Sequence, residues 1–538
     1  MKKQNKYHTL IAGGGIAGLV TALELAKSGQ QIIIVDRDTK ERIGGLARWA
    51  FGGMALCGTA EQKRQNIPDS PELLLKDWHS FANFGEDDYW PKAWAKDYAE
   101  NNHEMVYMWL KSLGAKFLPA VNWVERGLFN RGNSVPRYHI LWGTGWHLAE
   151  LIIKHLQPFI DNKQLTILHQ HKVENLICKK QQVIGAEVID EISGEKYSIN
   201  ADQVVLACGG INGSTERVRQ NWPTSWSKLP ETLLNGANPI SDGKLHDCVA
   251  ELDGNITHQD KMWNYAAGIP HPQPEFKGHG LSLVPCKSAL WMDHTGKRIG
   301  PMPLVTGFDT NYLCQQVANQ EKPWTWQILN WKIAAKEFAV SGSQHNPHIR
   351  NKNLFKLLKD TLLGNHRLIH QMVDECEDFI CADSLPELVD KMNKRTQKPY
   401  VDKEVLYAEI NEYDQKIKRG ITYCNDDQTR RIQHARQWRP DKLRTCAPQA
   451  IIDKKAGPLI AIKVQLISRK SLGGVQTNLK GQVLNQAKNS IAGLYCVGEA
   501  AGFGGGGASG FRSLEGTFLS GCILTARHAA SAIISIQE

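Results

Sequence analysis

Apolar and polar positions near the N-terminus predict a strand, a helix and a second strand in close succession. Residues 10–12 end one short apolar run, and residues 31–35 form a second run rich in β-branched side chains. Between the two runs, four apolar residues recur at helical spacing: Ile16, Leu19, Val20 and Leu23. Gly29 then supplies a natural helix stop. The pattern predicts a βαβ unit within the first 36 residues.

Strand-like runs return later in the chain. Residues 202–210 read as a buried strand that runs into a glycine turn. Before it, residues 183–189 and 195–199 flank the turn Ser193-Gly194, which predicts a small antiparallel excursion. Residues 493–497 predict another strand, and a final helix follows from about Thr517.

The middle of the chain has a different character. It carries helix-like stretches at residues 334–340, 354–363 and 405–417, and three tryptophans close together, Trp324, Trp326 and Trp331. The chain has sixteen tryptophans in all. Two interpretations remain open, a tryptophan-rich core and a large apolar pocket.

Length and composition indicate an ordinary multi-domain globular protein. The chain has 538 residues, of which 42% are hydrophobic and 22% are charged. At a typical domain length of ~150 residues, this length suggests about three units. The apolar run after Met1-Lys2-Lys3 is broken by polar residues and glycines, so it reads as a strand and not as a signal peptide. No run approaches the ~18 apolar residues of a spanning helix, which leads us to expect a cytoplasmic protein.

Charge and cysteine usage narrow the function classes further. The net charge of +9 is spread out, and dense basic stretches such as residues 391–398 are short and lack interleaved aromatics. We therefore expect a solvated surface and no nucleic-acid partner. The twelve cysteines contain no C-x-x-C pair, which gives no haem-attachment or iron–sulfur pattern, and we expect reduced, mostly buried thiols and no metal site.

The strongest chemical signal is the glycine motif within the predicted βαβ unit. Gly13, Gly15 and Gly18, with Ala17 between the last two, follow the first strand and open the helix. Such glycines let the backbone approach a pyrophosphate, which the helix N-terminus binds with its free N–H groups. Asp36 follows the second strand 23 residues after Gly13, where this unit needs an acid for a ribose hydroxyl. The unit predicts dinucleotide binding.

Two glycine pairs decide between NAD and FAD. Gly44-Gly45 and Gly52-Gly53 follow soon after Asp36 and Arg37, and they let a loop pass close along the flavin side of a cofactor. A flexible loop is the alternative, but Trp49 and Phe51 between the pairs favour a packed segment.

Further motifs fall in the order typical of one superfamily: Ala207-Cys208-Gly209-Gly210, Ser241-Asp242-Gly243, Leu472-Gly473-Gly474-Val475 and Gly498-Glu499. With the opening motif and glycine pairs, the chain resembles the flavoproteins of the fumarate reductase and succinate dehydrogenase superfamily, which includes 3-ketosteroid 1-dehydrogenases. The resemblance implies an α/β fold with a Rossmann-like FAD-binding domain from residues 1–262 and 472–538. An α+β cap domain, residues 263–471, is inserted between the two parts.

The same resemblance implies the cofactor contacts. FAD is expected to lie against the glycine motif, Asp36, Arg37, the two glycine pairs, Ala207, Gly209, Asp242 and Glu499. The helix that begins near Thr517 is expected to point at the flavin N1 edge, where it stabilises the anionic reduced ring. The segment between the glycine pairs lacks the histidine that attaches FAD covalently in succinate dehydrogenases, so we expect non-covalent FAD.

Arg512 and Gly516 are the main substrate candidates. In fumarate reductases an arginine at the matching point grips a substrate carboxylate. In ketosteroid dehydrogenases a tyrosine stands there, and a glycine four residues on offers its N–H to the ketone. This chain has the arginine and keeps the glycine, so the pair could hold a carboxylate or polarise a carbonyl.

Other candidates follow from the same comparison. Arg469 and Lys470 stand where fumarate reductases carry histidines, and Tyr265 lies near the place of another substrate-binding histidine. A phenol with a shifted pKa could act as acid or base, although a packed core tyrosine is an equal alternative. Tyr138 is a weaker candidate of the same kind.

One departure bears on the reaction. Fumarate reductases place a catalytic arginine after the segment matching Gly296-Lys297-Arg298, yet residues 300–309 contain none. We therefore expect an FAD-dependent dehydrogenase that moves hydrogen across a C–C bond next to a carbonyl, with an apolar ketone or enoate as substrate. An apolar ketone of the 3-ketosteroid type is favoured over a small dicarboxylate. A fumarate reductase-like enzyme and a non-catalytic electron-transfer flavoprotein remain alternatives. The sequence does not identify the electron acceptor.

Overall fold

The chain forms two compact units. The computed structural model describes residues 7–227, 229–502, 512 and 514–537. The first unit comprises Met1–Pro223, Ala237–Trp263 and Arg469–Glu538, and the second comprises Thr224–Gly236 and Asn264–Ser468. The sequence places residues 224–236 in the expected FAD-binding domain. In the structure they belong to the second unit.

A largely parallel sheet organises the first unit. Strands β1 (Tyr7–Ala12), β2 (Ile32–Val35) and β5 (Leu165–Leu168) pair in parallel, with Ile11 opposite Ile34. β1 also pairs in parallel with β8 (Lys196–Leu206), and the end of β8 pairs with β20 (Ser490–Cys496). Strands from both ends of the sequence therefore share one sheet, in an α/β arrangement with a parallel core.

The predicted antiparallel excursion is confirmed. β6 (His171–Lys179), β7 (Gln182–Asp190) and β8 pair antiparallel in sequence order. The two runs expected at residues 195–199 and 202–206 are one continuous strand, because β8 passes from β7 to β1 without a break.

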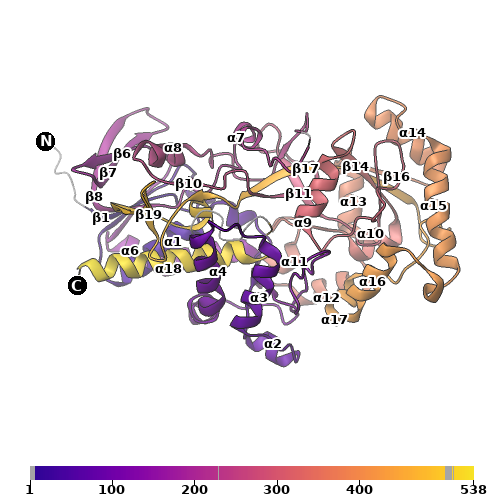
Figure 1. Ribbon diagram of the computed structural model, residues 1–538, viewed down its shortest axis with the longest axis horizontal. Helices are drawn as coiled ribbons and strands as arrows, with labels where there is room; N and C mark the ends of the chain where they lie inside the picture. Colours follow the sequence, from indigo (N-terminus) through magenta and orange to yellow (C-terminus); the bar gives the residue numbers. More distant parts are fainter. Residues whose placement is uncertain (1–6, 228, 503–511, 513, 538) are drawn as a thin grey trace. The chain divides into compact units, whose positions relative to one another are not determined.

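Three helices of the first unit pack together in its apolar core. α1 (Ile16–Lys27) contacts both α6 (Thr144–Asp161) and α18 (Thr517–Gln537), and Figure 1 shows α18 running beside α1. Leu19 and Leu23 of α1 are fully buried in this core, as the helical spacing predicted. The other elements are β3 (Gly53–Ala55), β4 (Tyr138–Ile140), β10 (Ile256–Thr257), β18 (Gly474–Val475), β19 (Gln482–Leu484), α2 (Ala60–Arg64), α3 (Pro71–Ala82), α4 (Tyr89–Asn101), α5 (Trp109–Ser112), α7 (Thr215–Gln220) and α8 (Lys244–Glu251).

α18 corrects one expectation. Its segment Thr517–Ile536 is long and apolar enough to cross a membrane, although no such run was expected. Half of the most apolar stretch of this helix is buried inside the protein. Ile523, Ala526 and Ile533 lie in the core with α1. This burial is that of a core helix, and a core helix can be as long and apolar as a membrane-spanning one.

The second unit is built on a mixed, mostly antiparallel sheet. Its strand order is β13 (Leu290–Met292), β14 (Trp324–Asn330), β17 (Leu459–Ser471), β11 (Met262–Pro270), β12 (Gly280–Val284) and β15 (Ala339–Val340). β9 (Leu234–Asn235) and β16 (Phe379–Ala382) also pair with β17. The helices are α9 (Thr310–Ala318), α10 (Trp331–Glu337), α11 (Pro347–Arg350), α12 (Leu354–Leu363), α13 (His366–Glu375), α14 (Leu385–Thr396), α15 (Lys403–Lys418), α16 (Asp427–Gln437) and α17 (Arg439–Arg444).

The predicted helices of this unit are confirmed at α12 and α15, but the stretch at 334–340 is partly wrong. α10 ends at Glu337 because Phe338 takes an extended conformation, and the chain continues into β15 beside β12. Trp326 on β14 is fully buried and packs edge to face on Trp324. Burial of Trp326 favours the core interpretation for this tryptophan.

Candidate active site

The glycine loop between β1 and α1 leaves no room for side chains. A Cβ at Gly13 would lie 2.4 Å from the carbonyl oxygen of Ala207, and one at Gly18 would lie 2.0 Å from that of Gly13. Gly15 precedes α1, and no side chain caps this helix end. The loop thus combines a close backbone approach with the N–H groups of a helix N-terminus, the combination that binds a phosphate group.

Asp36 joins the end of β2 to this loop. Its buried carboxylate accepts hydrogen bonds from the backbone N–H of Gly14 and, at 2.8 Å, from that of Asp38. Burial raises the pKa of Asp36, and the two N–H donors oppose that shift. The acid therefore lies beside the glycine loop, as its position in the sequence predicted.

Arg37 and Asp242 pair with each other. The guanidinium donates to Asp242 at 2.9 Å and to Glu191 at 3.0 Å. The arginine thus links β2 to the hairpin turn after β7 and to the segment before α8. Glu191 was not expected in this group, since nothing in its local sequence distinguishes it.

The first glycine pair lies against the dinucleotide loop, and the second lies beside β4. The N–H of Gly44 donates to the carbonyl of Gly14 at 2.8 Å, and Gly45 begins a short 3₁₀ helix. Gly52 accepts a hydrogen bond from Leu141 at 3.0 Å. The segment between the two pairs is therefore held by hydrogen bonds at both ends. This agrees with the packed segment that Trp49 and Phe51 predicted.

The remaining predicted cofactor residues lie at the ends of β8 and β20. The N–H of Ala207 donates a hydrogen bond to the carbonyl of Ala12 on β1 at 2.8 Å. Gly209 lies against the side chain of Ser241. Glu499 accepts a hydrogen bond from the N–H of Ser471 at 2.9 Å. Burial raises the pKa of Glu499 to about 7, so its charge state changes near neutral pH.

Lys470 lies in a partly apolar cluster of the first unit. Its ammonium group stands 3.8 Å from the ring centre of Phe518, the second residue of α18. Desolvation lowers the pKa of Lys470 to about 8, and the carboxylate of Glu515 partly opposes the shift. Glu515 in turn accepts a hydrogen bond from the indole of Trp263 at 2.9 Å.

Tyr138 lies in the same region, packed between two glycines. A Cβ at Gly53 would overlap its ring at 1.8 Å, and a Cβ at Gly516 would come within 2.9 Å of it. The carbonyl of Gly516 accepts a hydrogen bond from the N–H of Ala55 at 2.8 Å, which fixes the position of this glycine. Desolvation, and then the charge of Glu515, raise the pKa of Tyr138, so the phenol stays protonated at neutral pH.

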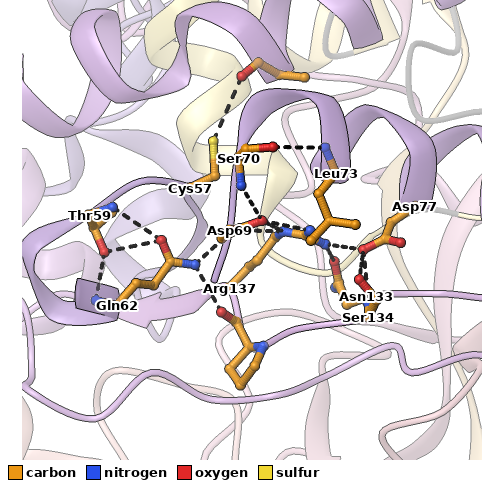
Figure 2. A network of polar contacts seen from close by, with 12 residues as sticks. Cys57, Thr59, Gln62, Asp69, Ser70, Leu73, Asp77, Asn133, Ser134 and Arg137 are labelled. Carbon is orange, nitrogen blue, oxygen red and sulfur yellow. Dashed lines mark hydrogen bonds and ion pairs between the residues drawn. The ribbon is translucent and has the colours of Figure 1, made fainter. Parts of the chain in front are cut away.

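A buried ion-pair network holds the strand that carries Tyr138. Figure 2 shows Arg137 between two acids, with Asp69 at 2.8 Å and Asp77 at 2.6 Å. All three side chains are at most 1% exposed. On the other side of Tyr138, the His139 ring bonds the Arg137 carbonyl at 2.6 Å and the Thr59 hydroxyl at 2.7 Å. Sequence reasoning missed this network, because its two acids lie 68 and 60 residues from Arg137.

The comparison with known families decides the identity of the cofactor. The family of the FAD binding domain matches residues 8–519. The chain belongs to this FAD-binding family. A KsdD-like steroid dehydrogenase of Mycobacterium tuberculosis is 39% identical over 97% of this chain and 94% of its own length.

More distant relatives share the fold of this FAD-binding family. A fumarate reductase (cytochrome) of Shewanella frigidimarina is 24% identical, over 97% of this chain and 76% of its own length. The structure of a 3-ketosteroid delta1-dehydrogenase from Sterolibacterium denitrificans, in complex with 1,4-androstadiene-3,17-dione, matches with a TM-score of 0.69 and 14% identity. That match covers 99% of this chain and 100% of the other.

FAD is therefore the cofactor, and the protein is an FAD-dependent oxidoreductase. The residues present fit such a group, because the loop around Gly13 excludes any Cβ and the buried carboxylate of Asp36 stands beside it. The resemblance to flavin dehydrogenases expected from the motifs is confirmed.

The predicted substrate residues are only partly brought together. Lys470 and Gly516 lie with Tyr138 around Glu515 in the first unit. Tyr265 is half-buried on β11 in the second unit. Arg512 is half-buried, and its backbone N–H donates to Ala82 at 3.2 Å. The glycine run 504–507 next to it lies outside the described residues.

Proposed function

We propose that this protein is an FAD-dependent dehydrogenase of 3-ketosteroids or similar apolar ketones. It moves hydrogen across a C–C bond next to the carbonyl group. The observation that carries this proposal is the 39% identity, over nearly the whole chain, with a KsdD-like steroid dehydrogenase. The partly apolar surroundings of Lys470 and Tyr138, which include the ring of Phe518, suit a hydrophobic substrate better than a small dicarboxylate.

FAD is held without a covalent bond in this proposal, by a Rossmann-like first unit, and the second unit is an α+β cap domain. The cofactor residues are those expected from the motifs: Gly13, Gly15, Ala17, Gly18, Asp36, Arg37, Gly44, Gly45, Gly52, Gly53, Ala207, Gly209, Asp242, Glu499 and Thr517. When bound, FAD supplies the two-electron acceptor for the hydrogen that leaves the substrate. Thr517 is the first residue of α18, whose positive N-terminal end favours negative charge nearby.

The chain's own residues bind the ketone and manage the proton. The N–H of Gly516 and the guanidinium of Arg512 hold the carbonyl oxygen. Tyr138 remains protonated because of its raised pKa, so its hydroxyl donates a hydrogen bond and does not act as a base. Lys470, with a pKa of about 8, is mainly a cation at pH 7 and stabilises negative charge that develops beside it. Tyr265 is the candidate for taking the proton from the carbon next to the carbonyl, a step that requires its phenolate form.

Steady-state assays of the purified holoprotein test this proposal. With an artificial electron acceptor, a 3-ketosteroid should be dehydrogenated, and reduction of the enzyme by the steroid should bleach the flavin absorbance. Arg512→Ala should lower kcat/KM by at least ~100-fold, the scale of losing one positioned electrostatic group. Turnover of fumarate or succinate, with no response to any ketosteroid, would overturn the proposal.

A fumarate reductase-like reaction is the second candidate, and Arg512 is the observation that favours it. Against it stands the absence of an arginine from residues 300–309. The nearby Arg298 does not replace that arginine in our proposal. Its guanidinium is engaged with Asp426 at 2.6 Å and with Gln428 at 2.6 Å.

A further inference from the structure

Helix α12 presents its apolar side to solvent. None of its ten residues is buried. Four large apolar side chains follow one another along a single stripe of the helix, and their exposed fractions are large: Leu354 54%, Phe355 79%, Leu358 50% and Leu362 71%. A helix that covers a core turns such a stripe inward. Here the stripe points the other way.

The side of α12 that rests on the protein is more polar. Leu357, Asp360 and Thr361 are its half-buried residues on that side. Asp360 pairs with His348 of α11 at 3.3 Å, and α12 contacts α11 and α17 (Figure 1). These contacts hold the helix in an orientation that keeps the apolar stripe outside.

Positive charge lies beside this stripe. Lys356 and Lys359 of α12 are exposed beside it. A groove of about 540 Å³ adjoins the end of the helix, where Leu362 and Leu363 form one wall. Lys332, Lys336 and Lys455 line the same groove, and none of the described residues that line it is acidic. An anionic group is therefore the complementary ligand for the groove.

We propose that α12 and the adjoining groove form a docking face for the surface of an anionic lipid bilayer. The docking face consists of Leu354, Phe355, Leu358, Leu362, Lys356 and Lys359 of α12 with Lys332, Lys336 and Lys455 of the groove. The apolar stripe enters the boundary between headgroups and acyl chains, and the lysines contact lipid phosphates. A second copy of this chain fits less well, because a twofold contact would bring the two sets of lysines together.

Vesicle sedimentation of the full-length holoprotein tests the docking face. The protein should sediment with vesicles of phosphatidylcholine and phosphatidylglycerol, remain in solution with phosphatidylcholine alone, and be released by high salt. Phe355→Ser should abolish most of the binding. Lys356→Gln and Lys359→Gln should each weaken it by roughly fivefold, the contribution of one cation near an anionic surface.

Ile192→Ser is the matched control, because Ile192 is 73% exposed but lies in the turn after β7 of the first unit. This variant should bind vesicles as the unchanged protein does. Flavin absorbance and melting temperature confirm that each variant is folded, and turnover of the ketone in solution should stay unchanged in all of them. The proposal is wrong if the protein ignores anionic vesicles or if Phe355→Ser binds them normally. It is also wrong if sedimentation velocity reveals a dimer that Phe355→Ser dissociates.

Discussion

Individual residues of the candidate site are defined by their surroundings more than by their type. Lys470 and Glu499 are ordinary charged residues in the sequence, yet burial brings the pKa of each close to neutral pH, about 8 and about 7. Tyr138 is one of thirteen tyrosines, and only its contact with Gly53 and Gly516 distinguishes it. Two predictions follow at this scale.

The charge of Lys470 predicts the alkaline limb of the pH profile. The ammonium group is present below its pKa of about 8 and is lost as the pH rises through that value. We therefore expect kcat/KM to fall above about pH 8. Lys470→Arg should move this limb to higher pH, because a guanidinium stays charged. Lys470→Met should lower kcat/KM by roughly 10–100-fold at pH 7 and remove the limb. A wild-type profile that stays flat to about pH 9 would contradict this role.

The contact between Gly53 and Tyr138 predicts that a single methyl group disturbs catalysis. In Gly53→Ala the new Cβ would overlap the phenol ring, so Tyr138 must move. We expect kcat per bound FAD to fall roughly 10–100-fold, because a displacement of about 1 Å has effects of this size. Tyr138→Phe should reproduce the loss. Gly85→Ala is the control, since its Cβ would lie 3.5 Å from the nearest atom. A fully active Gly53→Ala enzyme would remove Tyr138 from the site.

At the scale of elements, short strands in the first unit depend on contacts that are distant in sequence. β4 has only three residues, and the Arg137 network and His139 hold it on both sides of Tyr138. Desolvation lowers the pKa of His139 to about 4, so the ring stays neutral between its two partners. Such a network stabilises the strand only while every member is present.

Removal of Arg137 should therefore destabilise the first unit strongly. Arg137→Leu leaves two buried carboxylates without a counter-charge, a loss of about 3–5 kcal/mol in the free energy of unfolding. Differential scanning calorimetry should record a melting temperature lower by roughly 5–15 °C. Lys96→Ala removes an exposed ion pair with Glu100 and should cost less than about 1 kcal/mol. Equal effects of the two substitutions would contradict the proposed importance of burial.

At the scale of the whole molecule, strands from both chain ends build one sheet, and α1 packs on the C-terminal helix α18. The glycine loop that fits FAD lies within this arrangement. The proposed site holds FAD in the folded first unit and not in the unfolded chain, so FAD should stabilise the protein by mass action.

Added FAD should therefore raise the melting temperature, and the rise should follow the logarithm of the free FAD concentration once it exceeds the dissociation constant. An excess of 100 times the dissociation constant contributes about 2.7 kcal/mol. Gly13→Ala should abolish this shift, because its Cβ would overlap the Ala207 carbonyl. Gly194→Ala is a matched control. Gly194 also has a positive φ, but a Cβ there would meet nothing within 4 Å. A normal FAD-dependent shift in Gly13→Ala would show that the cofactor lies elsewhere.

Local sequence patterns were enough to predict the features that depend on neighbouring residues. The βαβ start, α12, α15 and the β7–β8 hairpin follow from local periodicity and turns, and the glycine motif with Asp36 predicted a dinucleotide-binding loop. The tertiary structure decided the rest: the continuity of β8, the end of α10 at Phe338, the Arg137 network, and the meeting of Gly53, Tyr138 and Gly516. The physical reason is the distance along the sequence over which each kind of interaction acts. Periodicity and steric preference act over a few residues, whereas burial, ion pairing and shifted pKa values depend on residues that only the folded chain brings together.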